Sequence, residues 1–100
     1  MSDRCAPRHT SKTFAAGDLT MSIAAGAPIH VYGIWLFTAG TAITFSINDG
    51  AGNLIQQVYL AANSFEELSQ YWIADAGIQI VASAGTNSPK ATVFHNSPGR

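Results

Sequence analysis

Ile43-Thr44-Phe45-Ser46-Ile47-Asn48-Asp49-Gly50 is the segment from which the fold class follows most directly. Its apolar residues alternate with polar ones, which is the period of two expected when one face of a β-strand is buried. The Asp49-Gly50 pair is typical of a hairpin turn, because glycine accepts the positive φ that such turns require. The sequence therefore predicts a half-buried strand, a turn, and a returning strand from Leu54 to Leu60.

Two strands are predicted upstream of this hairpin. The first is an alternating run from Leu19 to Ile23. The second, Ile29 to Thr38, is apolar on both faces, and such a strand must be covered twice. Strict alternation places Ile29, Val31, Trp35 and Phe37 on one face and Tyr32, Ile34 and Leu36 on the other. In a small sandwich, a neighbouring subunit or the docked N-terminal arm would provide the second cover.

Further strands are predicted downstream, around Ile78 and Ile80 and from Thr92 to His95. The segment from Ser64 to Leu68 is ambiguous, since Ser64 and Glu67 fit a helical capping box. We favour a strand or loop there, because the neighbouring segments are β and the segment is short for a helix. Strand-like runs between Gly, Asn and Pro turns predict an all-β fold, an antiparallel β-sandwich or jelly roll of about seven or eight strands.

The chain has 100 residues, which is enough for one hydrophobic core. Residues 1–12 are polar, contain Pro7 and show no period, and we expect them to form a flexible N-terminal arm. Residues 13–100 are then expected to form a single β-sandwich domain. The one cysteine, Cys5, excludes a disulfide within the chain.

The composition is unusual for a soluble domain, with 47% hydrophobic and only 11% charged residues. Disordered chains combine low hydrophobicity with high charge, so this chain is not of that class. The longest apolar run, Ile29 to Phe37, is about half the length of a membrane-spanning helix, and residues 1–25 do not resemble a secretory signal. We expect a protein made in the cytoplasm, with part of its apolar surface covered by another copy or another protein.

The charges are segregated along the chain. Residues 1–12 and residues 90–100 each carry a net charge of +2, whereas residues 13–89 contain five carboxylates and neither Lys nor Arg. Nucleic-acid affinity rests on clustered Lys and Arg, so this acidic body argues against a nucleic-acid partner.

The sequence shows little that suggests catalysis. It lacks a G-x-S-x-G turn, and Ser46 and Ser64 are expected to be structural. His30 and His95 would approach each other if their strands pair, but two histidines are too few for a metal site. We therefore expect no enzyme activity, no cofactor and no metal, and a small hydrolase remains a third hypothesis.

Aromatic side chains allow one binding hypothesis. Flat rings are what a carbohydrate-binding module uses, and Tyr59, Tyr71 and Trp72 are the candidates for a platform that takes host-surface glycans. Glu66 and Glu67 are adjacent and would diverge on a strand, so they do not form a pair for acid–base chemistry.

The order of these segments resembles small β-sandwich structural proteins of tailed bacteriophages. The segments that carry the resemblance lie between residues 19 and 95: Val31-Tyr32-Gly33-Ile34-Trp35-Leu36, Ile43 to Gly50, Trp72 to Ile80, and Ala91 to His95. The resemblance implies a virion component, such as a head decoration or a tail or fibre protein, without enzyme activity.

The leading hypothesis is thus a virion structural protein that binds itself, as a homotrimer, and larger virion proteins. The expected oligomer interface is Tyr32, Ile34, Trp35, Leu36 and Phe37. The alternative is the carbohydrate-binding module.

Overall fold

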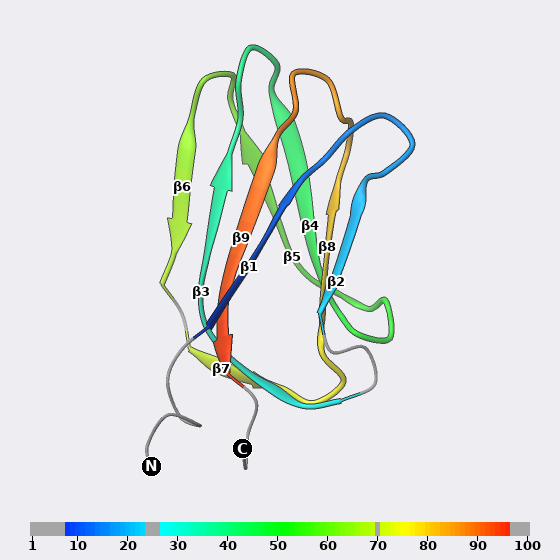
Figure 1. Ribbon diagram of the computed structural model, residues 1–100, viewed down its shortest axis with the longest axis vertical. Helices are drawn as coiled ribbons and strands as arrows, with labels where there is room; N and C mark the ends of the chain where they lie inside the picture. The colour runs from blue at the N-terminus through cyan, green and yellow to red at the C-terminus, as the bar shows by residue number, and fades with distance from the viewer. Residues whose placement is uncertain (1–7, 24–26, 70, 97–100) are drawn as a thin grey trace.

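The computed structural model describes residues 8–23, 27–69 and 71–96, and the regular elements in them are all β-strands (Figure 1). The strands are β1 (Arg8–Thr13), β2 (Thr20–Ile23), β3 (Ile29–Phe37), β4 (Ile43–Asp49), β5 (Leu54–Leu60), β6 (Phe65–Leu68), β7 (Trp72–Ala74), β8 (Ile78–Ala82) and β9 (Lys90–Asn96). This confirms the predicted all-β fold class, with nine strands in place of the expected seven or eight. No helix in the described ranges is long and apolar enough to span a membrane.

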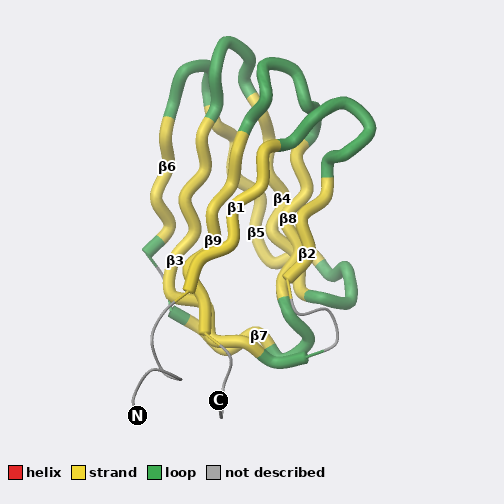
Figure 2. The backbone as a smooth tube through the Cα atoms, viewed as in Figure 1, coloured by secondary structure: helices red, strands yellow, loops and turns green. Residues whose placement is uncertain are grey.

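The strands form two antiparallel sheets that face each other (Figure 2). One sheet has the order β1-β9-β3-β6, with β7 also paired to β3, and the other has the order β2-β8-β4-β5. Strands β6 and β7 share one edge of β3: β7 pairs with its first residues, and β6 pairs with its last.

The core lies between the two sheets. Alternation explains its composition, because every second residue of β4 and of β8 is buried. Buried side chains of this size each stabilise the fold by roughly 1.5–3 kcal/mol relative to exposure. The largest fully buried side chains are Phe14, Phe45, Ile29, Ile34, Leu36, Ile43, Ile47, Ile78, Ile80, Val31 and Val93, with Pro89.

The predicted hairpin joins β4 to β5, but its glycines act differently from the prediction. The positive φ belongs to Gly52, at 92°, and not to Gly50. Asp49 closes the turn, since its Oδ1 accepts hydrogen bonds from the backbone N–H groups of Asn53 and Ala51, both at 2.9 Å. These bonds, above all those from Asn53, stabilise the carboxylate and lower the pKa of Asp49.

The flexible arm was predicted too long. Residues 8–12 belong to β1, which pairs with β9 along its whole length, from Arg8 opposite His95 to Thr13 opposite Lys90. Sequence patterning did not reveal β1 because it buries no apolar side chain, and it is an edge strand stabilised by backbone pairing. Residues 1–7 lie outside the described part of the chain.

A β-bulge in β3 corrects the predicted faces of that strand. Val31 pairs with His95 and Gly33 pairs with Phe94, so Tyr32 is an extra residue that has no partner on β9. The alternation shifts by one residue at this point, and Ile34 and Leu36 therefore join Val31 in the core.

The ambiguous segment after Ser64 is a strand, as favoured from the sequence. Phe65–Leu68 forms β6, with Phe65 opposite Phe37 and Leu68 opposite Ile34.

Candidate functional site

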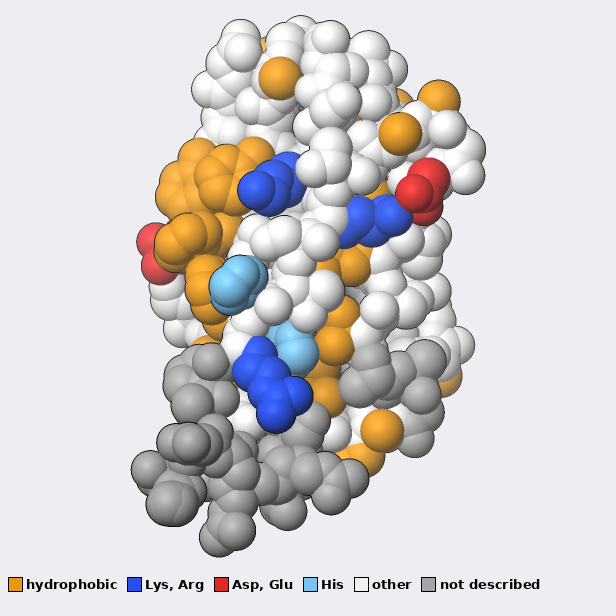
Figure 3. Space-filling model, viewed as in Figure 1, with side chains coloured by type: hydrophobic (Ala, Val, Ile, Leu, Met, Phe, Trp, Pro, Cys, Tyr) orange, Lys and Arg blue, Asp and Glu red, His pale blue; other side chains and the backbone are white. Residues whose placement is uncertain are grey.

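The outer face of the five-stranded sheet carries an aromatic stripe, which we define as His9, Trp35, Phe37, Phe65 and Phe94. Four different strands contribute these side chains: β1, β3, β6 and β9. Figure 3 shows hydrophobic side chains gathered over β6 and β3 on this face, beside basic and histidine side chains. The stripe therefore crosses the whole sheet.

Neighbouring rings of the stripe are in contact range. The ring centroids of Phe65 and Phe37 are 4.9 Å apart, and those of Trp35 and Phe94 are 4.8 Å apart. His9 extends the series, at 6.1 Å from Phe94. The indole of Trp35 stands nearly edge-on to its neighbours, at 81° to Phe65 and 69° to Phe94. Edge-to-face pairs are a favoured aromatic geometry, worth roughly 0.5–1.5 kcal/mol each.

One ring of the stripe, that of Phe94, packs over Gly33 of β3. A Cβ built on Gly33 would lie 4.0 Å from Cδ2 of Phe94, so the Phe94 ring lies over the glycine. The same strand carries Trp35 two residues later, on the same outer face. The bulge at Tyr32 determines which β3 side chains enter the stripe.

Much of the stripe remains open to solvent. Trp35 is 36% exposed and Phe65 is 49% exposed. Beside Trp35 lies a hollow of about 360 Å³, whose lining includes Phe37, Phe94 and Lys90. Its floor contains a hydroxyl pair, with Oγ of Ser11 and Oγ1 of Thr92 joined by a 2.8 Å hydrogen bond. The surface thus has a projecting ring and a hollow side by side.

The outer face of the other sheet has a different character. Strands β2, β5 and β8 contain no charged residue, and β4 contains only Asp49 at its end. Amide and hydroxyl side chains bond to each other there: Gln57 Nε2 donates to Ser46 Oγ at 3.3 Å, and Asn48 donates to Gln79 at 2.9 Å. Aromatic surface is thus concentrated on the five-stranded sheet.

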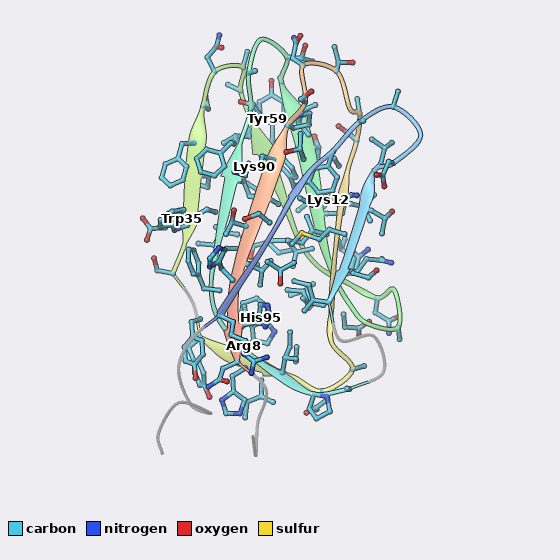
Figure 4. All side chains as sticks on the ribbon, in the orientation of Figure 1. Arg8, Lys12, Trp35, Tyr59, Lys90 and His95 are labelled. Carbon is cyan, nitrogen blue, oxygen red and sulfur yellow. The ribbon has the colours of Figure 1, made fainter. Side chains whose placement is uncertain are left out.

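The residues of the interface expected from the sequence lie partly on the surface and partly in the core. Trp35 and Phe37 lie on the stripe (Trp35 is labelled in Figure 4), whereas Ile34 and Leu36 are fully buried within the chain and cannot meet a partner. Their assignment to an interface was wrong, because the bulge reverses the faces of β3 beyond Tyr32. Tyr32 is exposed, and its ring packs 5.2 Å from that of Tyr71.

The three residues of the expected glycan platform are distributed over both sheets. Tyr59 projects from β5 in the four-stranded sheet (Figure 4), whereas Tyr71 and Trp72 belong to the segment that pairs with β3. The Tyr71 hydroxyl hydrogen-bonds Nδ1 of His30 at 2.9 Å, and Trp72 packs against the core. Tyr59 therefore does not share a surface with the other two.

Strands β3 and β9 do pair, but His30 and His95 take opposite faces. His95 lies opposite the buried Val31, so it faces the interior, where its Nε2 is 2.8 Å from Oγ1 of Thr10. Burial lowers the pKa of His95, and the charges of Arg8 and His9 lower it further.

The remaining candidates for chemistry form ordinary structural contacts. Ser46 accepts a hydrogen bond from Gln57, and Ser64 donates one to the carbonyl of Ala62. Glu66 and Glu67 lie on opposite faces of β6. Within residues 8–23, 27–69 and 71–96, no group of three His, Cys, Asp or Glu side chains could hold a metal ion.

Sequence reasoning missed His9, Phe65 and Phe94 as parts of the surface. Their outward direction depends on which strands are neighbours and in which register, and neither is visible in one sequence. A partial signal was present, since Phe65 is an aromatic residue in a strand whose next residues are carboxylates.

No protein-family model matches the sequence, and the comparison with curated proteins found no match. Solved structures with similar folds include a protein of Bacillus endospore appendages, described as disulfide-linked pili, with a TM-score of 0.49 and 16% identity over 92% of this chain and 85% of that one. A cupin protein from Bacteroides fragilis has a TM-score of 0.44 and 11% identity, over 93% and 67% of the two chains.

The VP2 subviral particle of infectious bursal disease virus gives a TM-score of 0.34 and 14% identity, over 94% of this chain and 34% of that one. None of these three is described as a tailed-phage protein. Similarity at this level does not transfer a function from those proteins to this chain.

Proposed function

We propose that this chain is a non-enzymatic structural protein that binds a second copy of itself through the aromatic stripe, as part of a larger particle. The observation that carries the proposal is the exposed stripe of neighbouring aromatic rings on the outer face of the five-stranded sheet. Soluble monomers rarely expose contiguous apolar patches, and the cores of protein interfaces are enriched in aromatic residues.

Shape and charge favour a second copy as the partner. Trp35 projects beside a hollow of about 360 Å³, which is large enough for an aromatic side chain of a facing copy. Lys90 lies opposite Phe37 and Glu67 lies opposite Trp35, so both charge signs border the same surface. A two-fold arrangement pairs one patch with itself and brings unlike charges within reach of each other.

A two-fold contact between stripes changes the number of chains expected in the oligomer. A flat sheet face that meets its own copy joins two chains, so we propose a dimer or a multiple of dimers in place of the homotrimer expected from the sequence. A virion location, as a head decoration or a tail or fibre component, rests on the resemblance in strand order described above.

The ring geometry favours a protein partner over a glycan. A sugar platform needs ring faces that lie in one plane, whereas Trp35 stands at 80° to Phe37 and 81° to Phe65. Such rings form ridges that interlock with another protein surface.

Solution mass measured by light scattering over a range of concentrations tests the proposal. We expect the wild-type chain to form dimers and Trp35→Ser to be monomeric. Tyr59→Ser is the matched control, because Tyr59 is 69% exposed but lies on the other sheet. Dimers that survive Trp35→Ser but dissociate in Tyr59→Ser would show that the interface lies on the other sheet.

A further inference from the structure

A second surface lies where the two sheets open between β5 and β6. A pocket of about 430 Å³ occurs there, and its lining is mostly apolar: Ile47, Ile55, Gln56, Leu68, Tyr71 and Trp72. Strands β4 and β5 supply one wall, and β6, β7 and the segment between them supply the other. The pocket thus enters the sandwich from the side, away from the aromatic stripe.

Strand β5 borders this pocket and is the last strand of its sheet among the described residues. Its sequence, LIQQVYL, has no charge and no proline, the usual devices that protect an edge strand from pairing with another chain. Leu54 is 58% exposed and Ile55 is 50% exposed. Ile55 forms a bulge opposite β4, and pairing is regular from Gln56 to Leu60, so this part of the edge is suited to accept a strand.

A carboxylate lies near the pocket. Glu66 is on the same face of β6 as Leu68, which lines the pocket, and the chain has neither Lys nor Arg between residues 13 and 89. A partner with Lys or Arg side chains would therefore find complementary charge at β6.

Among the described residues, the edge strands β1 and β2 do not have the required properties. Strand β1 is basic, but its sequence RHTSKT has no apolar side chain to fill the pocket. Strand β2 is an edge with apolar residues, but Met21 and Ile23 are buried in the core. We therefore assign the complementary segment to a different protein.

We propose that an extended peptide segment of another protein adds to the edge of β5, places apolar side chains at alternate positions in the pocket, and directs Lys or Arg toward β6. In this mode of recognition, backbone hydrogen bonds supply affinity and the pocket supplies specificity. The site is separate from the stripe, so both surfaces can be occupied together.

The probe is a fluorescein-labelled peptide of about nine residues, with leucine at alternate positions, threonine between them and a lysine at each end. Fluorescence anisotropy with the full chain should show saturable binding. The Trp35→Ser chain should bind the peptide equally well, which separates this site from the proposed self-assembly. A dissociation constant weaker than about 1 mM would overturn the proposal.

Two N-methylated peptides test the strand pairing. Methylation of every second backbone nitrogen blocks one hydrogen-bonding edge of an extended peptide and leaves the other edge intact. We expect one of the two alternating methylation patterns to weaken binding by about tenfold or more and the other to have little effect. Equal affinity of both methylated peptides would overturn strand addition and leave only unspecific apolar contact.

Two adjacent glutamines provide a matched pair of protein variants. Gln56 lines the pocket, whereas Gln57 lies on the other face of β5 and bonds to Ser46. Gln56→Phe fills the pocket and should weaken binding about tenfold, while Gln57→Phe adds the same ring outside it and should change affinity less than about twofold. A similar loss in both variants would place the peptide elsewhere.

Discussion

Gly50 and Gly52 lie in the same turn but are required for different reasons. A Cβ at Gly50 would lie 1.6 Å from the carbonyl oxygen of Ala76, so only a glycine permits this contact between the turn and the segment before β8. At Gly52 a Cβ has open space, and only the φ of 92° disfavours a side chain.

The two alanine variants should therefore differ in stability. We expect Gly50→Ala to lower the free energy of unfolding by about 3 kcal/mol, because the backbone must move to relieve the clash. Gly52→Ala should cost about 1 kcal/mol, the strain of a left-handed conformation. Urea unfolding measures both, and the reverse order would mean that the contact with Ala76 is not required.

His95 should make stability depend on pH. Its pKa in the folded chain lies below the ordinary value of 6.5, so the unfolded chain binds the proton more readily. The contribution of His95 to the free energy of unfolding is fully present above about pH 6.5. This stability is lost as the pH falls through that value toward the pKa of His95 in the folded chain. Urea unfolding between pH 7.5 and about pH 5 should show this loss, and an unchanged pH slope in His95→Gln would contradict the assignment.

Strand β3 shows how one extra residue changes the role of its neighbours. Because Tyr32 is bulged, Ile34 belongs to the core and Trp35 to the surface. We expect Ile34→Ala to lower the free energy of unfolding by about 2–5 kcal/mol. Trp35→Ser, measured at a concentration where the wild-type chain is monomeric, should cost about 1 kcal/mol or less. Thermal or urea unfolding measures the loss of stability in each variant, and equal losses would argue against the bulge.

At the level of strands, much of the fold was predictable. The alternation of Ile43, Phe45 and Ile47 predicted β4, and the apolar run from Ile29 predicted β3, because local periodicity records which side chains are buried. The bulge was not predictable, since it exists only relative to the partner strand β9. The candidate site depended on this missing information, and only Trp35 and Phe37 of the stripe were predicted as an interface.

Considered as a whole, the molecule depends on β1 to complete the five-stranded sheet. Besides backbone pairing, β1 contributes the Thr10–His95 and Ser11–Thr92 hydrogen bonds and the 2.8 Å ion pair between Lys12 and Asp18. A chain that begins at residue 14 should lose about 3 kcal/mol or more relative to one that begins at residue 8. Residues 1–7 are absent from both chains, so β1 is the only difference between them. Urea unfolding measures both stabilities, and equal stability would show that β1 is dispensable.

The pairing of the first strand with the last also affects synthesis. Thr10 must meet His95, which follows it by 85 residues, and the sequence between them includes every other strand. On the ribosome, β9 is the last of these strands to emerge from the exit tunnel, so the five-stranded sheet cannot close until all the others have emerged. The four-stranded sheet is complete once β8 has emerged. Native structure is thus expected to form slowly, as is typical of folds dominated by contacts between distant residues.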